Sequence, residues 1–150
     1  MIIEIILFNL QCNSTLTMAQ MHLNITGEQI DHESLSINYS TKLVKAKLKV
    51  FFFKDKDTQQ KVFYVPSLEV TGYGTDDQEA QAMVIDSIND CFFHLVNLPK
   101  KQFERELRDL GWKENKIFHK QYSKMLVDVK GVLKNFNAEE NTVGSLTLVA

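Results

Sequence analysis

Residues 43–53 read L-V-K-A-K-L-K-V-F-F-F, and this stretch decides the fold of the chain. Apolar and basic side chains alternate along it, which is the period of a β-strand with one buried side and one side in water. The core side is predicted to hold Val44, Ala46, Leu48, Val50 and Phe52. The other side holds Lys45, Lys47 and Lys49, followed in the same phase by Phe51 and Phe53.

Two more strands and a helix are predicted directly after this strand. Residues 55–60 (D-K-D-T-Q-Q) are typical of a turn, and residues 61–65 return as the second arm of an antiparallel hairpin. Pro66 removes a backbone donor and marks a break, after which residues 68–73 form a third short strand. Thr75 and Gln78 have the spacing of a capping box, so a helix should begin there. Its buried stripe is predicted to be Ala80, Met83, Val84, Ile88, Cys91 and Leu95.

The resulting fold class is α+β, with an antiparallel three-stranded sheet covered by a helix. A second helix should follow Pro99 and end at Gly111 and Trp112. Residues 125–136 predict a further amphipathic helix, and S-L-T-L-V-A at the C-terminus predicts a closing strand. We therefore divide the chain into an N-terminal arm or added strands (1–41), a core with its second helix (42–112), and an extension of the same domain (113–150).

Composition and charge describe an ordinary globular domain. The chain has 150 residues, 44% of them hydrophobic, and a net charge of −2. Residues 54–98 hold three lysines against eight carboxylates, whereas residues 99–135 hold ten basic against five acidic residues. This asymmetry suits an interface or self-association, and solvated helix faces are the plain alternative.

The two cysteines, Cys12 and Cys91, lack the spacing of a disulfide framework or a zinc site. They predict a reducing cytoplasm. The apolar start is too short to span a bilayer, so no membrane contact is expected.

No catalytic set emerges from the sequence, and the chain is predicted not to be an enzyme and to need no cofactor or metal. The carboxylates that could bind magnesium occupy turn and helix-start positions, where surface or capping roles are favoured; they are Asp55, Asp57, Glu69, Asp76 and Asp77. Cys91 and His94 are spaced i, i+3, but a packed thiol is favoured over a catalytic pair. The other histidines are scattered.

The run F-Y-V-P-S-L-E-V-T-G-Y-G-T-D-D-Q-E-A, residues 63–80, resembles the signature of the HicB-like antitoxin family. In that signature an aromatic strand and a proline precede a short strand, a Gly-x-Gly turn and a capped acidic helix start. The resemblance covers about residues 43–98, and L-R-D-L-G-W at 107–112 is similar to the continuation in some short members. It implies a βββα core, which is a degenerate RNase H-like fold without the nuclease carboxylates. It also implies a non-enzymatic protein that binds and blocks a small RNA-cleaving toxin of the HicA type.

Many members of that family also bind operator DNA through a C-terminal ribbon-helix-helix or helix-turn-helix part. Here two predicted helices precede a final strand, which is the wrong order for a ribbon-helix-helix, so DNA binding is not favoured. An orphan HicB-like module and a DNA-binding regulator remain the alternatives to an antitoxin.

Two sets of outward residues are candidates for binding. Phe51 and Phe53 on the wet side of a strand require a cover from the N-terminal arm, the C-terminal helix or another subunit. We therefore expect a homo-oligomer or another protein partner to contact Phe51, Phe53, Tyr64 and Tyr73. Lys45, Lys47 and Lys49 are candidate contacts to nucleic acid, with a solubilising or dimer surface as the alternative.

Overall fold

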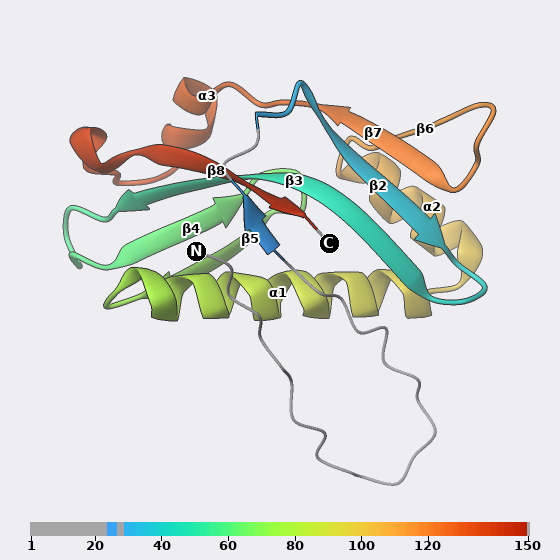
Figure 1. The fold of residues 1–150 in the computed structure, drawn as a ribbon, viewed down its shortest axis with the longest axis horizontal. Coiled ribbons are helices and arrows are strands. Elements are labelled where there is room, and N and C mark those ends of the chain that lie inside the picture. The colour runs from blue at the N-terminus through green and yellow to red at the C-terminus, as the bar shows by residue number, and fades with distance from the viewer. Residues whose placement is uncertain (1–23, 27–28, 150) are drawn as a thin grey trace, which may run out of the picture.

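In the part of the chain that the structure describes, two helices pack on one face of a single antiparallel sheet (Figure 1). The computed structural model describes residues 24–26 and 29–149. The eight strands are β1 (Asn24–Thr26), β2 (His32–Asn38), β3 (Leu43–Lys54), β4 (Lys61–Val65), β5 (Val70–Gly74), β6 (Lys113–Glu114), β7 (Gln121–Met125) and β8 (Gly144–Val149). The helices are α1 (Asp77–Asn97), α2 (Lys100–Asp109) and α3 (Val129–Leu133), with a 3-10 turn η1 (Glu140–Thr142). The predicted α+β class with an antiparallel sheet is confirmed.

The long strand β3 is the centre of the sheet, because other strands pair with it along both of its edges. One edge pairs with β8 over Lys47–Phe52. The other edge pairs first with β2, over Leu43–Lys47, and then with β4, over Phe51–Lys54. The predicted hairpin of β3 and β4 is thus confirmed, and β5 continues it as a third antiparallel strand beside β4.

Burial confirms the alternation predicted for β3 from Val44 to Val50. Beyond Val50 it does not, because Phe51 and Phe53, predicted on the wet side, are buried, whereas Phe52, predicted in the core, is half-buried. Val44, Ala46, Leu48 and Val50 are buried on the face that α1 and α2 cover, which we call the inner face. From α1, this core receives Ala80, Val84, Ile88, Phe92, Leu95 and Val96. Met83 and Cys91 were predicted within the buried stripe but are only half-buried. Phe92 and Val96 are buried in their place, because α1 presents them to the sheet.

Two glycines of β5 allow α1 to lie against the strand. A Cβ atom on Gly72 would be 2.2 Å from the backbone nitrogen of Val84, and one on Gly74 would be 2.7 Å from the nitrogen of Ala80. Side chains of α1 also cover the free edge of β5. The Ser87 hydroxyl donates to the Thr71 carbonyl over 3.2 Å, and the Tyr73 N–H donates to the Met83 sulfur over 3.4 Å. This coverage removes an edge that could otherwise pair with another chain.

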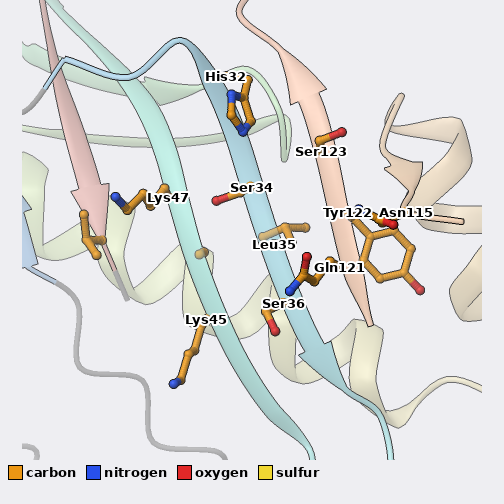
Figure 2. Close-up of a pocket in the computed structure, with 12 residues that line it drawn as sticks. His32, Ser34, Leu35, Ser36, Lys45, Lys47, Asn115, Gln121, Tyr122 and Ser123 are labelled. Carbon is orange, nitrogen blue, oxygen red and sulfur yellow. The ribbon is translucent and has the colours of Figure 1, made fainter. Parts of the chain in front are cut away.

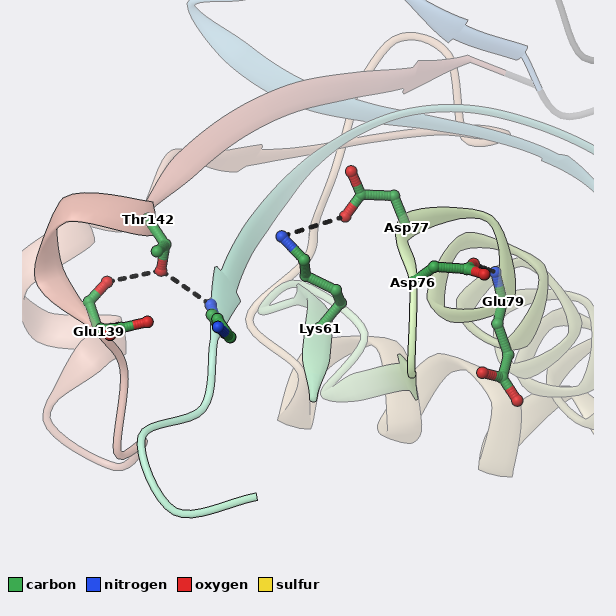
Figure 3. A network of polar contacts seen from close by, with 7 residues as sticks. Lys61, Asp76, Asp77, Glu79, Glu139 and Thr142 are labelled. Carbon is green, nitrogen blue, oxygen red and sulfur yellow. Dashed lines mark hydrogen bonds and ion pairs between the residues drawn. The ribbon is translucent and has the colours of Figure 1, made fainter. Parts of the chain in front are cut away.

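The start of α1 differs by one residue from the prediction. Asp76, not Thr75, is the N-cap, and its carboxylate accepts from the Glu79 N–H over 2.8 Å (Figure 3). The Glu79 carboxylate in turn accepts from the backbone and the hydroxyl of Thr75. Glu79 therefore takes the role predicted for Gln78, because the helix begins at Asp77 and the third helical residue is the one that reaches back.

Helix α2 follows the prediction, since Pro99 precedes it and Phe103 and Leu107 are its buried residues. Gly111 has a φ of +87°, the left-handed conformation that suits a residue after a helix. Trp112 is 3% exposed and donates from Nε1 to the Ser67 carbonyl over 3.0 Å. Within the described residues, no helix is long and apolar enough to cross a membrane.

The C-terminal third contains the largest differences. Residues 113–125 were predicted to include a polar connection, but they form the β6–β7 hairpin, in which β7 pairs with β2. The helix predicted over 125–136 is wrong in extent, because Met125 ends β7 and α3 spans only Val129–Leu133. The predicted closing strand is confirmed as β8, which lies between β1 and β3. Strands β1 and β2 belong to residues 1–41, for which the sequence predicted either an N-terminal arm or added strands. Residues 1–23 of this segment lie outside the described part.

Candidate binding face

The outer face of the sheet, opposite α1 and α2, carries the candidate site (Figure 1). Partners in an antiparallel ladder point to the same side, so the register determines which side chains share this face. Lys47 pairs with Ser34, which pairs with Ser123. Lys45 pairs with Ser36, which pairs with Gln121. These residues, together with Lys49, His32 and Lys113, which pairs with Ser123, make up what we call the polar outer face.

A cavity of about 480 Å³ lies on this polar outer face, above β2, β3 and β7. The labelled side chains in Figure 2 come from these three strands and from Asn115 of the β6–β7 hairpin. Hydroxyl, amide and ammonium groups line the cavity together with apolar groups, among them those of Leu35, Ala46 and Val149. Such a lining can bind a polar or anionic ligand.

The three predicted lysines lie together on this face. Lys45 is exposed, whereas Lys47 and Lys49 are half-buried. No carboxylate occupies an outward position in the described parts of β2, β3, β6, β7 and β8. The polar outer face is therefore positively charged, and its role in nucleic-acid binding stays a prediction.

The aromatic candidates occupy the other end of the same outer face. Phe51 and Phe53 are each 2% exposed. Phe136 covers this end, with ring centroids 5.2 Å from Phe53 and 4.8 Å from Tyr64. Phe51 and Phe53 are therefore almost fully buried within the chain itself, and Phe136 of the C-terminal segment packs on Phe53. A role of these aromatic residues in partner binding stays a prediction. Tyr64 is half-buried and Tyr73 is 50% exposed, so Tyr73 is the most accessible of the four.

Hydrogen bonds hold this covering segment on the end of β3. The Lys54 N–H donates to the Thr142 hydroxyl over 2.9 Å, and the Thr142 hydroxyl donates to the Glu139 carbonyl over 2.6 Å (Figure 3). The Glu139 N–H donates to the Lys54 carbonyl, and Ala138 forms an isolated bridge with Asp55. Residues 136–142, which we call the C-terminal strap, therefore continue the ladder beyond β8.

The carboxylates considered for a metal site lie in separate places. Asp55 accepts from Asp57 and Thr58 in the β3–β4 turn, and these bonds, chiefly from the Thr58 backbone, lower the pKa of Asp55. Asp76 caps α1, and Asp77 lies 3.8 Å from the Lys61 ammonium. Glu69 lies in the turn before β5, with a φ of +56°. Within residues 24–26 and 29–149, no three His, Cys, Asp or Glu side chains lie close enough to hold a metal ion.

Cys91 is a packed thiol. It is half-buried against the core, and burial, with a smaller contribution from Glu106, raises its pKa to about 11. A thiol with that pKa is almost entirely protonated at neutral pH, which makes it a poor nucleophile. Cys12 lies outside the described residues.

Glu33 is a buried residue that the sequence analysis missed. It is 1% exposed, and its carboxylate accepts from the Lys49 N–H and the Ser67 hydroxyl, each over 2.8 Å. Burial raises its pKa, although these two hydrogen bonds and the charges of Lys124 and Lys49 oppose the shift. The alternation H-E-S-L-S-I-N was the available signal, since it places Glu33 in phase with Leu35 and Ile37.

No protein-family model, no curated protein and no solved structure matches this chain. A functional assignment therefore depends on the residues and contacts described above.

Proposed function

We propose that this chain is a non-enzymatic binding module of the HicB-like type, acting as the antitoxin that blocks a small basic RNase-like protein by direct contact. Support comes from the sequence resemblance over residues 43–98 and from the order of the elements in that region. Three antiparallel strands, β3, β4 and β5, are followed at once by α1, which packs on β5 and β4. This order agrees with the βββα core that the resemblance implies.

The outward side of α1 is the single observation that favours a basic protein partner. Asp86 and Asp90 are exposed and lie one helical turn apart, at i and i+4. Like charges at this spacing destabilise a helix by a few tenths of a kcal/mol. Helix α1 contains no lysine or arginine that could offset them. A basic partner would neutralise these carboxylates on binding.

Tyr73 is the aromatic residue of this proposed contact. Its backbone N–H donates to Met83 of α1, so Tyr73 lies where the edge of β5 meets the helix. Its side chain is 50% exposed, and tyrosine is enriched among the residues that dominate protein interfaces. Tyr64 is half-buried beneath Phe136 and is expected to contribute less.

Co-expression tests the proposal. The chain is produced together with the small protein encoded by the adjacent reading frame, and growth and co-purification are measured. We expect relief of toxicity and a stable complex, and weaker complex formation when Asp86→Asn and Asp90→Asn are combined. The control, Asp57→Asn with Glu140→Gln, makes the same charge change at exposed sites away from α1 and should bind normally. If the neighbouring protein neither binds nor harms growth, the antitoxin proposal fails.

A further inference from the structure

The polar outer face combines positive charge with a row of side chains that crosses the sheet. Lys47, Ser34, Ser123 and Lys113 follow one another on neighbouring strands β3, β2, β7 and β6. Neighbouring strands are about 4.8 Å apart, so this row spans roughly 14 Å. Lys45 and Lys49 lie on the same side of β3 as Lys47, two residues before it and two residues after it. Several cations on one rigid surface match the spaced charges of a phosphate backbone.

Hydrogen-bonding groups fill the space between these lysines. Ser34, Ser36 and Gln121 line the cavity of about 480 Å³ that lies on the outer face above β2, β3 and β7. Hydroxyl and amide side chains can contact phosphate, sugar and base edges. The cavity is therefore suited to an extended anionic chain with polar groups along it.

The loop of the β6–β7 hairpin, whose two ends Asn115 and Gln121 line the cavity, carries an exposed aromatic residue, Phe118. Asn115 and Gln121 both line the cavity, and the Asn115 N–H donates to the Gln121 carbonyl over 2.8 Å. These residues form the base of the loop 116–120. The Asn115 side chain accepts from the N–H groups of Ile117 and Phe118, which fixes the tip of the loop. Phe118 is 59% exposed in this ordered loop and can stack on an unpaired base.

We propose that the polar outer face binds single-stranded nucleic acid, with Lys45, Lys49 and Lys113 contacting phosphates and Phe118 stacking on a base. A duplex is a poorer fit, because reading its groove requires a helix or a ribbon that enters the groove, whereas this site is a cavity in the surface of a sheet. Charge complementarity alone would also allow an acidic protein segment. The combination of lysines with an exposed aromatic residue on the loop that borders the cavity favours a strand with accessible bases.

Fluorescence anisotropy tests this proposal on the full chain. The probes are labelled oligouridylate and oligothymidylate of about 12 nucleotides, a length within the range that single-strand binding domains cover. Contacts from three or four lysines predict that log K falls with log salt concentration with a slope of about −2 to −3. Binding of either probe supports the proposal.

Charge-matched variants separate the site from a general charge effect. Each lost phosphate contact should reduce affinity roughly tenfold at about 50 mM salt. We expect the combined variant Lys45→Gln, Lys49→Gln, Lys113→Gln to lose about a thousandfold in affinity at this salt concentration and to flatten the salt slope by about 2. The control variant Lys56→Gln, Lys100→Gln, Lys101→Gln removes the same charge from the β3–β4 turn and α2, and should bind as the unmodified chain does. Phe118→Ala should weaken binding without changing the salt slope.

Four results would overturn the proposal. They are no binding of either oligonucleotide at low salt, an equal loss in the control variant, tighter binding of a duplex than of both single strands, and equally tight binding of polyglutamate. The last would assign the face to an acidic protein. The outcome is independent of the antitoxin proposal. Asp86 and Asp90 lie on α1, which packs on the inner face of the sheet, so Asp86→Asn with Asp90→Asn should leave oligonucleotide binding on the outer face intact.

Discussion

The hydroxyl of Ser67 donates a 2.8 Å hydrogen bond to the carboxylate of Glu33, and this buried bond joins β2 to the turn after β4. It lies where one edge of β3 changes its partner from β2 to β4. At this change the Lys49 N–H has no strand partner on that edge, and the Glu33 side chain accepts its hydrogen bond instead. Glu33 thus substitutes for a missing piece of backbone.

Glu33→Ala, which removes the carboxylate, should destabilise the fold much more than Glu33→Gln, which only removes its charge. Glu33→Ala leaves the Lys49 N–H and the Ser67 hydroxyl buried without an acceptor, and each unsatisfied donor costs about 1–3 kcal/mol. We expect a loss of about 2–4 kcal/mol in the free energy of unfolding. Glu33→Gln keeps an acceptor oxygen and should stay within about 1 kcal/mol of the unmodified chain. Urea unfolding followed by Trp112 fluorescence checks both, and equal losses in the two variants would contradict this role of the carboxylate.

The raised pKa of Glu33 also predicts a pH dependence with a defined sign. In the unfolded chain this carboxyl loses its proton near its ordinary pKa of 4.5, whereas burial keeps it protonated to higher pH in the folded state. The stabilisation by protonated Glu33 is complete below pH 4.5 and is lost as the pH rises through the folded pKa. The stability of Glu33→Gln relative to the unmodified chain should therefore increase with pH over this window.

Groups with lowered pKa values do not obscure that comparison. The pKa values of Asp55 and Glu79 lie below their ordinary values, so their contributions are lost as the pH falls. Both groups are present in the two proteins and cancel in the difference. A pH-independent difference would contradict the assignment to Glu33.

Gly72→Ala should separate α1 from β5. The new Cβ would lie 2.2 Å from the Val84 nitrogen and 2.5 Å from the Ala80 carbonyl oxygen, which are backbone atoms that cannot rotate away. We expect a loss of about 3 kcal/mol or more in the free energy of unfolding. Gly131→Ala is the control, because no atom lies within 4 Å of its added methyl group. It should be neutral or stabilise the protein by up to about 1 kcal/mol, so similar effects at the two sites would refute the proposed close approach.

Phe136→Ala should weaken the C-terminal strap. The ring packs on Phe53 and Tyr64 and is itself half-buried, so we expect a loss of about 1–3 kcal/mol, less than for a fully buried phenylalanine. Faster hydrogen exchange at the Glu139 N–H, which donates to Lys54, should accompany this loss. Phe118→Ala removes a ring that is 59% exposed and should leave both measurements unchanged.

Cys91 should react slowly with alkylating reagents in the folded protein. With a pKa of about 11 instead of the ordinary 9.0, its thiolate fraction at pH 8 is about a hundredfold lower. Iodoacetamide labelling of a Cys12→Ser variant, compared in the folded and the urea-unfolded states, measures this difference. Rapid labelling of the folded chain would show that Cys91 is more accessible than its packing indicates.

The sequence predicted the elements whose pattern is local and strongly periodic. Strand β3 was recognised from its alternation of apolar and basic residues. Helix α2 was recognised from its helical spacing, with Pro99 before it and Gly111 after it. The cover over Phe51 and Phe53 was also anticipated, with a C-terminal helix among the candidates. Phe136, which packs on Phe53, lies just after α3 and was not recognised as a covering residue.

The remaining features depend on contacts between distant segments. Strand β7 reads Q-Y-S-K-M, with one buried residue, Tyr122, so its pattern does not separate a strand from a polar connection. It becomes a strand by pairing with β2, nearly ninety residues earlier in the chain. The polar outer face likewise needs β2, β3 and β7 side by side, which no single stretch of sequence reveals. Only the shared side of Lys45, Lys47 and Lys49 could be predicted from β3 alone.

The place of β8 between β1 and β3 has a consequence for how the protein is made. Until residues 144–149 have left the ribosome, the Lys47–Phe52 edge of β3 has no strand beside it and β1 has nothing to join. Among the described strands β8 is therefore synthesised last, although it lies inside the sheet. Before β8 is synthesised, the growing chain exposes an unpaired edge of β3 that can pair with other chains. A chaperone that shields unpaired strand edges would therefore bind β3 at this stage.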